Sequence, residues 1–449
     1  MGRLFGTDGV RGVANSELTP ELAFKLGKAG AHVLSNDKKK PVVLIGKDTR
    51  LSGDMLEDAL SAGILAVGGS VIKVGVLPTP AIAYLVKAYH ADAGVVISAS
   101  HNPFEYNGIK FFNSEGFKLD DDIEDQIEDI ILRDIDVNSH ITGDKLGRCL
   151  DADDDAADRY AVFLEDTIDV DIKGIKLVLD CANGAAYKIA EMVYSDLGAD
   201  ITVIGNEPNG ININEKCGST HPEKLQDEVV KQGAFLGLAY DGDADRLIAV
   251  DEKGRIIDGD KLICICAKMM KDKNQLPGDR VTATVMSNIG FHKYIEGMGC
   301  SVDVTSVGDR YVLERMLQTG CTIGGEQSGH IIFLNHTTTG DGILSSLQLL
   351  QAILLSGKKP SELSDEIEIF PQVLKNARVK NENKEKYKSD KDVMAAIEAV
   401  EKELEGQGRV LIRPSGTEPL VRVMLEGQDV SHITKLAEDL AVLLTKRFG

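Results

Sequence analysis

Three aspartates alternate with small residues in the segment DGDADR, directly after the apolar run GLAY. If this segment continues as an extended strand, every second side chain points to the same side, which brings the carboxylates of Asp241, Asp243 and Asp245 together. Carboxylate oxygens are hard ligands that suit Mg²⁺ or Ca²⁺ rather than zinc or copper. The segment therefore predicts a magnesium site.

An EF-hand calcium loop is the main alternative for this segment, because Glu252 falls at the twelfth place counted from Asp241. That loop needs glycine at its sixth place, where this chain has Arg246, and a helix before it, where this chain has a strand-like run. A solvated acidic turn without a metal is the second alternative. The magnesium site is favoured over both.

A serine-containing turn, SASHNP at residues 98–103, follows the apolar run AGVVI. Ser100 in such a turn can accept a phosphoryl group and pass it on, which divides one transfer into two easier steps. His101 and Lys110 are near in sequence and are candidates for moving protons. Taken alone, the motif fits an ordinary Asn-Pro turn equally well. A Ser-His-Asp hydrolase is disfavoured because the chain has no G-x-S-x-G elbow.

A third motif, RPSGTEP at residues 413–419, has the composition of a phosphate-binding loop. An arginine supplies a forked donor, hydroxyls donate hydrogen bonds, and a glycine lets backbone amides approach an anion. The candidate phosphate-binding residues are Arg413, Ser415, Gly416, Thr417 and, in the following strand, Arg422. A plain Pro-Ser-Gly turn is the alternative.

Two further glycine-rich segments carry polar side chains. FGTDGVRG near the start of the chain contains Arg11 and would suit a phosphate. GEQSGH at 325–330 brings Glu326, Ser328 and His330 onto one loop, with glycines that allow close approach, which is typical of a clamp for sugar hydroxyls. Each segment is weak evidence by itself.

The elements that position these loops repeat three times along the chain. Each copy opens with an apolar strand, at Pro41, Lys176 and Arg280, and continues as helix, strand, helix and strand. SASHNP, DGDADR and GEQSGH then stand at the same place, directly before one more strand. This alternation predicts an α/β fold of mixed sheets sandwiched by helices. Because ligands gather beyond the carboxyl ends of such strands, the three loops are expected to meet at a central cleft.

Changes in composition suggest the domain boundaries. An acidic stretch at 149–160 and the segment 251–260 resemble linkers or helix starts, and after Glu366 a charged tract leads to a helix, two short strands around RPSGTEP and a final helix. We predict α/β domains at 1–150, 151–252 and 253–366, and a smaller α+β domain at 367–449. In order, they carry the serine, the metal loop, the sugar loop and the phosphate loop.

Charge and composition exclude several classes of function. A formal net charge of −21 argues against nucleic acid and against an anionic membrane surface, whereas a few cations focused in a cleft still suit an anionic small molecule. The chain has no long apolar run and no apparent signal peptide, and its seven cysteines include no CxxC pair. We expect a cytoplasmic protein with buried free cysteines and no zinc site.

Taken in order, FGTDGVRG, ISASHNPFEYNGIKFF, DGDADR, VGDRYV, GEQSGH and RPSGTEP resemble the α-D-phosphohexomutase superfamily over essentially the whole chain. They are most similar to its members that act on glucosamine phosphate. The resemblance implies that Ser100 carries the transferred phosphate and, as phosphoserine, completes a site for one Mg²⁺. It also implies glucosamine 1,6-bisphosphate as intermediate and primer between glucosamine 6-phosphate and glucosamine 1-phosphate, on the route to UDP-N-acetylglucosamine and cell-wall precursors.

The same resemblance assigns roles to the remaining candidates. Arg11 and Lys110 would line the serine, Arg246 would lie beside the metal loop, and Lys110 or His330 would be the general acid/base. Glu326 and Ser328 would bind sugar hydroxyls, and the residues of the phosphate loop would hold the phosphate that does not react. Superfamily members often dimerise, so a homodimer stays open, as does a kinase that primes Ser100.

Two alternatives stay open at this point. A sister enzyme would prefer mannose or glucose phosphates, acting as a phosphomannomutase or phosphoglucomutase. A non-catalytic sugar-phosphate or metal-binding protein would bind without turnover, which the intact set of catalytic residue types disfavours.

Overall fold

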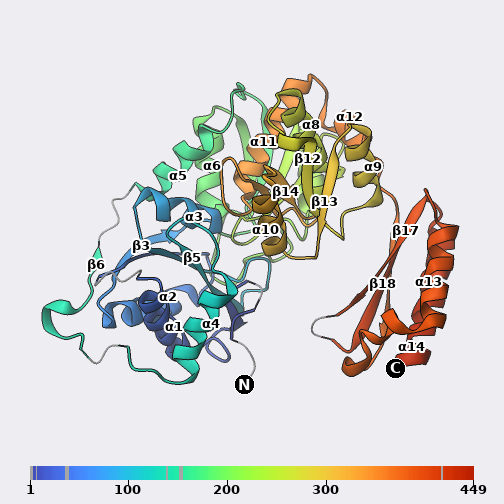
Figure 1. Cartoon of the computed structure of the whole chain (residues 1–449). Helices are drawn as coiled ribbons and strands as arrows, with labels where there is room; N and C mark the ends of the chain where they lie inside the picture. Colours follow the sequence, from blue (N-terminus) through green and yellow to red (C-terminus); the bar gives the residue numbers. More distant parts are fainter. Residues whose placement is uncertain (1–3, 7, 36–39, 138–139, 151–154, 416–417) are drawn as a thin grey trace. The chain divides into compact units, whose positions relative to one another are not determined.

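The computed structural model describes residues 4–6, 8–35, 40–137, 140–150, 155–415 and 418–449. The chain divides into two compact units, of which the first comprises Met1–Thr284 and Asp303–Asp365 and the second comprises Val285–Val302 and Glu366–Gly449. Figure 1 shows the elements of both. The first unit holds the serine, metal and sugar loops, and the second holds the phosphate loop.

The first sheet has the strand order β1-β5-β4-β2-β3-β6, in which β2, β3 and β4 are parallel and β5 is antiparallel to β4. Helices cover both of its faces: Val43 and Ile45 pack with the core under α1, α2 and α4, whereas Gly46 and Gly94 lie against α3 (Figure 1). The elements are β1 (Val10–Val13), α1 (Pro20–Val33), β2 (Val42–Lys47), α2 (Gly53–Ala66), β3 (Ser70–Val76), α3 (Thr79–Ala88), β4 (Ala93–Ile97), β5 (Tyr106–Asn113), α4 (Asp121–Leu132) and β6 (Cys149–Leu150).

Two more sheets follow, with the orders β11-β10-β9-β7-β8 and β13-β12-β14-β15. Their strands are β7 (Lys176–Asp180), β8 (Asp200–Ile204), β9 (Leu236–Tyr240), β10 (Leu247–Asp251), β11 (Ile256–Ile257), β12 (Arg280–Thr284), β13 (Ser301–Thr305), β14 (Ile323–Gly325) and β15 (Ile331–Phe333). The helices are α5 (Ala156–Glu165), α6 (Ala186–Asp196), α7 (Glu223–Gln232), α8 (Gly259–Asp272), α9 (Ile289–Gly297), α10 (Asp309–Thr319), α11 (Gly342–Ser356) and α12 (Pro360–Asp365).

The strand order confirms the threefold repeat. In each sheet the four repeat strands, numbered along the chain, are arranged fourth, third, first, second: β5-β4-β2-β3, β10-β9-β7-β8 and β15-β14-β12-β13. The serine, metal and sugar loops each connect the third strand of a copy to the fourth. The three loops therefore occupy equivalent positions, as the sequence predicts.

Helix α11 anchors the interior of the first unit. It is buried along most of its length, consistent with its nearly unbroken apolar sequence. Asp341 caps its N-terminus by accepting a hydrogen bond from Leu344 N at 2.9 Å, and Tyr160 Oη donates to the same carboxylate at 2.7 Å. Asp341 N also donates to Ile331 O at 3.3 Å, at the residue that follows the GEQSGH loop, so this cap ties the end of that loop to α11.

The second unit is built on a three-stranded antiparallel sheet in the order β16-β18-β17. Helices α13 and α14 pack against this sheet and enclose an apolar core. Its elements are β16 (Gln372–Arg378), α13 (Lys391–Glu403), β17 (Gly408–Pro414), β18 (Leu420–Gly427) and α14 (Val430–Phe448), with short 3-10 turns at Asn381–Asn383 and Lys386–Ser389. Two more 3-10 turns, at Gly143–Lys145 and Pro277–Asp279, belong to the first unit.

The segment around α9 belongs to this second unit. Ile289 N donates to the buried carboxylate of Glu426 at 2.8 Å, and Asn288 Nδ2 donates to Phe370 O at 2.9 Å. Arg409 binds Glu426 with its Nε at 2.7 Å and also reaches Ser287 O. Residues 287–289, which precede the sheet by some eighty positions in the sequence, thus supply polar contacts to the second unit.

The structure corrects three details of the sequence interpretation. Residues 251–260 are not a linker: they form the β10–β11 hairpin and the start of α8. The C-terminal sheet has three strands, because β16 precedes the charged tract. Six of the seven free cysteines are buried as expected, whereas Cys149 is exposed on β6.

The fold class itself, three similar α/β domains of mixed sheets and a smaller α+β domain, is confirmed. Within the described ranges, no helix combines the length and the apolar character that a membrane crossing requires.

The helix α9 contains a histidine that should make stability depend on acid pH. Burial, with a smaller contribution from Arg409, lowers the pKa of His292 from 6.5 to about 4. As pH falls from 6.5 towards 4, His292 becomes protonated in the unfolded chain but stays neutral in the folded chain, so the free energy of unfolding decreases. After allowing for the partly exposed ring, we expect a loss of about 2 kcal/mol.

Urea unfolding of the wild type and of His292→Asn at several pH values measures this loss. The variant should lose less stability on acidification than the wild type. His432→Asn, which removes an exposed histidine of the same unit, is the control and should keep the wild-type slope. Equal acid sensitivity of His292→Asn and the wild type would contradict the assignment.

Candidate active site

The serine, metal and sugar loops meet inside the first unit. Ser100 Oγ donates a hydrogen bond to Asp241 Oδ2 at 2.6 Å, which joins the first loop to the second. Arg246 and His330 form a backbone bridge, and Leu247 N donates to Gly329 O at 3.0 Å, which joins the second loop to the third. The repeat therefore brings its three equivalent loops into contact.

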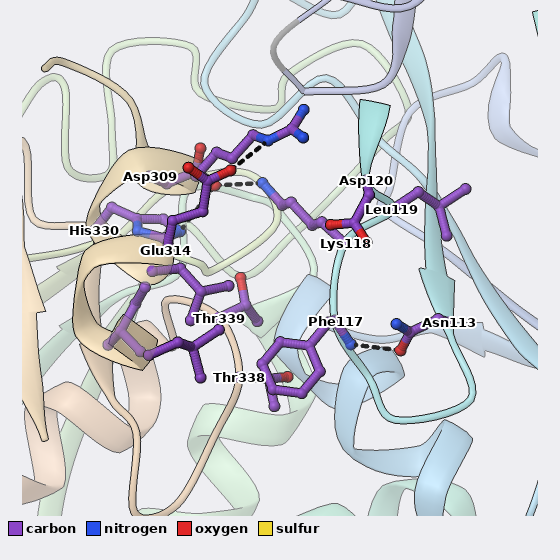
Figure 2. Close-up of a pocket in the computed structure, with 14 residues that line it drawn as sticks. Asn113, Phe117, Lys118, Leu119, Asp120, Asp309, Glu314, His330, Thr338 and Thr339 are labelled. Atoms are coloured by element: carbon purple, nitrogen blue, oxygen red, sulfur yellow. Dashed lines mark hydrogen bonds and ion pairs between the residues drawn. The ribbon is translucent and has the colours of Figure 1, made fainter. Parts of the chain in front are cut away.

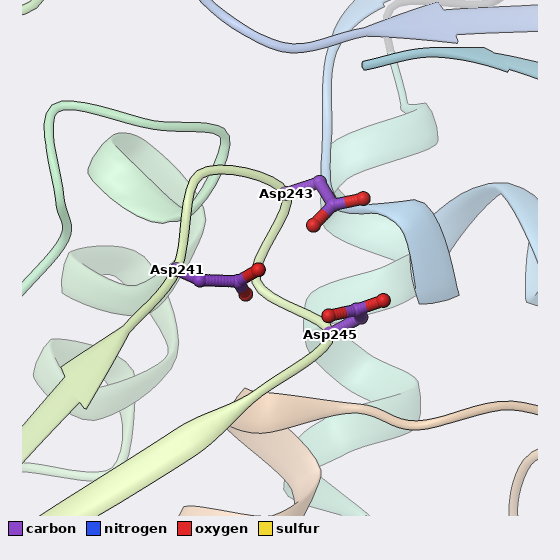
Figure 3. A group of neighbouring side chains, drawn as sticks. All are labelled: Asp241, Asp243 and Asp245. Carbon is purple, nitrogen blue, oxygen red and sulfur yellow. The ribbon is translucent and has the colours of Figure 1, made fainter. Parts of the chain in front are cut away.

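The acidic triad lies on a turn rather than on the extended strand that the sequence suggests. Strand β9 ends at Tyr240, Ala244 N donates to Asp241 O at 3.0 Å, and Ala244 has a left-handed φ of 55°. This turn still brings the three carboxylates together: one oxygen of each lies within 4.8 Å of the others (Figure 3). The convergence was expected, but strand alternation is not its cause.

Burial and mutual repulsion dominate the electrostatics of the triad. Burial raises the pKa of Asp241 well above its usual range, and the charges of Asp245 and Asp243 raise it further. Burial and the charge of Asp243 also raise the pKa of Asp245. Burial acts on Asp243 in the same direction, but Lys110 outweighs it and brings this pKa below its usual range. The triad is short of positive charge.

The triad fits a hard divalent cation. The Oδ1 atoms of Asp243 and Asp245 are buried and have no hydrogen-bond partner among the described residues. Buried carboxylate oxygens are normally paired, because leaving them unpaired costs free energy. With one oxygen of each aspartate within 4.8 Å of the others, Asp241, Asp243 and Asp245 can hold a metal ion, and the unpaired oxygens of Asp243 and Asp245 are available to it.

Ser100 lies at the edge of this triad, and its side chain is almost completely buried. Its Oγ is 3.2 Å from Nδ1 of His101. Burial, followed by the charges of Arg246 and Arg11, lowers the pKa of His101 to about 4. The ring beside the serine is therefore uncharged at neutral pH, and two arginines lie close enough to influence it.

Lys110 is held between two carboxylates. Its Nζ is 2.8 Å from Asp243 Oδ2 and 3.0 Å from Asp8 Oδ2, and only 2% of its side chain is exposed. Burial lowers the pKa of Lys110, but Asp243 and Asp8 together raise it above its ordinary value. Asp8 also pairs with Arg11. Lys110 is consequently a fixed cation beside the serine and the triad.

Side chains of alternating charge lead from Asp8 through Lys118 and Asp309 to His330. Figure 2 shows Lys118, Asp309 and His330. Lys118 Nζ binds Asp8 Oδ1 at 2.7 Å and pairs with Asp309, whose Oδ2 lies 3.8 Å from His330 Nε2. Lys118, Asp309 and His330 are among the residues that line a cavity of about 360 Å³ between the β5–α4 segment and α10. The ion pairs connect the surroundings of Lys110 to those of His330.

Sequence reasoning missed Asp8, Lys118 and Asp309. Asp8 stands in FGTDGVRG and Asp309 in VGDRYV, two motifs that were recognised without a role for these carboxylates. Lys118 lies in no motif, and its partners are 110 and 191 positions away in the sequence. Only the fold brings these three residues together.

His330 is buried, and neither of its ring nitrogens has a hydrogen-bond partner among the described residues. Its Nε2 lies 3.8 Å from Asp245 Oδ2, and equally far from Asp309. Gly340 faces the ring so closely that a Cβ there would lie 2.5 Å from both Cδ2 and Nε2. The imidazole is thus held in place while its nitrogens remain available.

Three other predicted residues lie on the metal loop and the sugar loop. Arg246 donates its backbone N–H to Asp241 Oδ1 at 3.1 Å, and its Nε lies 3.7 Å from Asp245 Oδ1. Glu326 is half-buried and accepts a hydrogen bond from Gly308 N at 3.1 Å. Ser328 is exposed at the tip of its loop.

The remaining predicted site residues lie in the second unit. Arg413 on β17 and Arg422 on β18 are directly opposite in the strand register. Burial lowers the pKa of Arg413, and the charge of Arg422 lowers it further. Ser415 is buried and accepts a hydrogen bond from Glu418 N at 3.2 Å. Gly416 and Thr417 lie outside the described residues.

Four sequence families match successive parts of the chain. They are described as the phosphoglucomutase/phosphomannomutase alpha/beta/alpha domains I, II and III, at residues 2–137, 157–254 and 258–370, and the C-terminal domain, at 374–443. Together they cover most of the chain, in the order of the four predicted domains.

Relatives extend this similarity over the full length. The chain is 56% identical over 447 residues to a phosphoglucosamine mutase of Clostridium acetobutylicum and 57% identical over 451 residues to one of Caldicellulosiruptor bescii; each match covers 100% of both chains. A phosphoglucomutase/phosphomannomutase family protein of Burkholderia thailandensis has a similar structure, with a TM-score of 0.82, 24% identity, and coverage of 99% of this chain and 97% of that one.

An N-acetylphosphoglucosamine mutase of Aspergillus fumigatus, solved in complex with GlcNAc-6P and magnesium, also shares the fold. Its TM-score is 0.70 at 19% identity, with coverage of 99% of this chain and 96% of the other.

Metal binding should stabilise the folded chain. A divalent cation binds the assembled triad and not the unfolded chain, so at 100 times its dissociation constant it adds about 2.7 kcal/mol. Thermal unfolding of metal-stripped protein with increasing MgCl₂ or MnCl₂ measures this gain. Asp241→Asn should melt higher than the wild type without metal, because it removes repulsion, and should gain less from the cation.

Asp227→Asn is the matched control, since Asp227 is an exposed aspartate on α7. It should respond to the cation as the wild type does. A metal-induced shift of full size in Asp241→Asn would show that the cation binds elsewhere.

Proposed function

Because the chain belongs to the phosphoglucomutase/phosphomannomutase family, and within it to the phosphoglucosamine mutases, we propose that it interconverts glucosamine 6-phosphate and glucosamine 1-phosphate through a phosphorylated Ser100. It is an isomerase that moves a phosphoryl group between two oxygens of one sugar. The route passes through glucosamine 1,6-bisphosphate, and its product would supply the synthesis of UDP-N-acetylglucosamine and cell-wall precursors.

One observation carries the chemical part of this proposal. The hydroxyl of Ser100 is 2.6 Å from a carboxylate of a metal-competent triad and 3.2 Å from the ring of His101, on which the charges of Arg246, Arg11 and Lys110 all act. A buried serine that is never phosphorylated would not need positive charges close to it. A phosphorylated serine brings close to two negative charges, which the cations and a bound metal neutralise.

In the forward direction, phosphoserine 100 is the donor. The C1 hydroxyl oxygen of glucosamine 6-phosphate attacks phosphorus, the bond from phosphorus to Ser100 Oγ breaks, and the C1 hydroxyl proton passes to a base. Ser100 Oγ takes up a proton as it leaves, so the products are the 1,6-bisphosphate and a free serine hydroxyl. After the bisphosphate turns around, Ser100 Oγ gives its proton to a base and attacks the phosphorus at the 6-position, the bond from that phosphorus to the C6 oxygen breaks, and the released C6 oxygen takes up a proton. The phosphoserine is restored, and glucosamine 1-phosphate leaves.

The metal in this proposal is Mg²⁺, held by Asp241, Asp243, Asp245 and an oxygen of phosphoserine 100. When bound, it neutralises charge on the transferring phosphoryl group, which is most of what catalysis of such a transfer requires. Lys110 serves the same purpose from the protein side, because its two carboxylate partners keep it protonated.

The proton carrier is His330 in this proposal, with Lys110 as the alternative. Lys110 is committed to ion pairs of 2.8 and 3.0 Å and holds its proton firmly. His330 has two free ring nitrogens beside the triad, as a group that must both take and return a proton requires. His101, uncharged at neutral pH, is placed to accept a hydrogen bond from the serine hydroxyl.

Substrate binding is assigned to the remaining residues. Glu326 and Ser328 would bind sugar hydroxyls. Arg413, Ser415, Gly416, Thr417 and Arg422 would hold the phosphate that does not react. Support comes from the register of β17 and β18, which places two like charges directly opposite one another, an arrangement that favours an anion between them.

Two partners remain predictions: a second copy of the chain, and a kinase that primes Ser100. Size-exclusion chromatography with light scattering tests the first. Intact-mass analysis of protein made with and without the glucosamine bisphosphate tests whether Ser100 needs another enzyme for its first phosphate.

Replacement of Ser100 by alanine should abolish the mutase reaction. The covalent step has no substitute, so we expect kcat/KM to fall by about three orders of magnitude or more, about 4 kcal/mol. A coupled assay for glucosamine 1-phosphate measures this, and mass spectrometry should find phosphate on Ser100 of the wild type only.

Ser114→Ala, in the turn after β5, is the control and should keep full activity. Parallel kcat/KM values for glucosamine, glucose and mannose 6-phosphates show which sugar is preferred. Full activity of Ser100→Ala would refute the phosphoserine mechanism.

Replacement of Gly340 by alanine should displace the His330 ring, because the new Cβ would lie 2.5 Å from two of its atoms. If His330 carries the proton, Gly340→Ala and His330→Ala should both lower kcat, by about 100-fold or more for the second. Gly297→Ala is the control, since a Cβ at Gly297 meets nothing within 4 Å.

Stopped-assay values of kcat and KM, with thermal melting to verify folding, provide the test. If His330→Ala keeps near wild-type kcat, Lys110 takes the role of the carrier.

A further inference from the structure

The backbone of Ser100 is strained. Its φ is 52°, in the left-handed region that residues other than glycine rarely adopt. Such a conformation costs about 1–3 kcal/mol and persists only where the surroundings hold it in place. The contacts that hold this turn are therefore part of how the serine is presented to the triad.

Arg50 binds the turn from the first sheet. Its Nη2 donates to Ser100 O and to Asn102 O, each at 2.9 Å, and its Nη1 donates to Pro103 O at 2.6 Å. These bonds all go to backbone carbonyl oxygens. The planar guanidinium can reach three carbonyls of one turn at once, which a lysine cannot do.

Arg50 is itself fixed by Asp48. Its Nε donates to Asp48 Oδ2 at 2.9 Å, and both side chains are fully buried. The same carboxylate oxygen accepts a hydrogen bond from Ser98 Oγ at 2.6 Å, and Ser98 Oγ in turn accepts from Ser100 N at 3.0 Å. Arg50 is therefore paired with a carboxylate, as Lys110 and Arg11 are, and in addition it binds three backbone carbonyls of the serine turn.

Asn214 binds the same turn from the second repeat. Its Nδ2 donates to Ser100 O at 2.9 Å and to Asn102 O at 3.2 Å. Its own backbone N–H donates to Ala182 O at 2.9 Å, which ties it to the segment after β7. Gly242, between the first two aspartates, leaves the necessary room: a Cβ there would lie 2.5 Å from Ser100 O and 2.9 Å from Asn214 Nδ2.

We propose that Arg50 and Asn214 are positioning residues for phosphoryl transfer: they grip the carbonyls of Ser100 and Asn102 from two repeats and keep Ser100 Oγ on the triad in both halves of the reaction. This inference rests on the proposed function. Neither residue touches Ser100 Oγ in the structure, so both act through the backbone of the turn. Their loss should misplace the phosphoryl group and leave sugar binding unchanged.

Asn214→Asp is the sharpest variant, because it keeps the size of the side chain and replaces the donor by an acceptor that repels the two carbonyls. A misplacement of about 1 Å can cost about 100-fold in rate. We expect kcat to fall by about 10- to 100-fold, with KM for glucosamine 6-phosphate changed by no more than about twofold. Arg50→Lys keeps the charge but loses the planar guanidinium, and it should likewise lower kcat while leaving KM nearly unchanged.

Asn212→Asp is the matched control. Asn212 lies in the same segment, and its Nδ2 donates to Glu207 O at 3.0 Å, away from the serine turn. It should keep wild-type kcat and KM. Rates are compared per phosphorylated Ser100, measured by intact mass with the bisphosphate present, and thermal melting verifies that each variant is folded.

Hydrogen exchange provides a readout that does not need catalysis. Amides in the peptide over residues 98–104 should exchange faster in Asn214→Asp and Arg50→Lys than in the wild type, and not in Asn212→Asp. An inactive wild type would refute the proposed function, and the exchange data alone would then decide on the clamp. Unchanged exchange, or a kcat in Asn214→Asp equal to that of Asn212→Asp, would overturn the proposal.

Discussion

Three buried carboxylates whose oxygens lie within 4.8 Å of one another repel each other, and the surrounding residues offset that repulsion with opposite charge and hydrogen bonds. Lys110 neutralises Asp243, Arg246 lies beside Asp245, and Ser100 donates its hydroxyl proton to Asp241. These partners leave oxygens of Asp243 and Asp245 without a hydrogen bond. Asp241, Asp243 and Asp245 would hold a divalent cation at this place, and that cation would supply the positive charge that the carboxylates lack. In the proposed function, this charge would allow an acid-rich chain to bind an anionic substrate.

The same constraint explains why lysines and histidines in this site differ in behaviour. Lys110 and Lys118 each lie between two carboxylates and are held in the charged state. Burial, together with the charges of Arg246 and Arg11, lowers the pKa of His101 to about 4. His330 faces carboxylates at 3.8 Å without forming a hydrogen bond to them. Fixed cations, an uncharged hydrogen-bond acceptor and a free imidazole therefore occur within one small volume.

Sequence patterns predicted the candidate site residues and the repeat that positions them, because both appear as local motifs at regular intervals. Ser100, Lys110, the three aspartates and His330 were all expected, and the structure brings them together. Patterns did not reveal Asp8, Lys118, Arg50 or Asn214 as parts of the site. These residues contact partners that are 50 to 191 positions away, and no local signal marks a lysine or an asparagine for such a contact. The turn at Ala244 was missed for a related reason: a left-handed alanine follows from its surroundings, not from its type.

The grouping of residues 285–302 with the C-terminal sheet has a practical consequence for cutting the chain into pieces. A fragment that starts near residue 366 would contain the whole C-terminal sheet and its two helices, yet it would lack Ile289 N and Ser287 O, the partners of Glu426 and Arg409. A fragment that ends there would leave α9 without the residues that cover it. Limited proteolysis, domain exchange with a relative and split-protein designs on this scaffold therefore need a break elsewhere. The C-terminal part is continuous as a family domain but discontinuous as a folding unit.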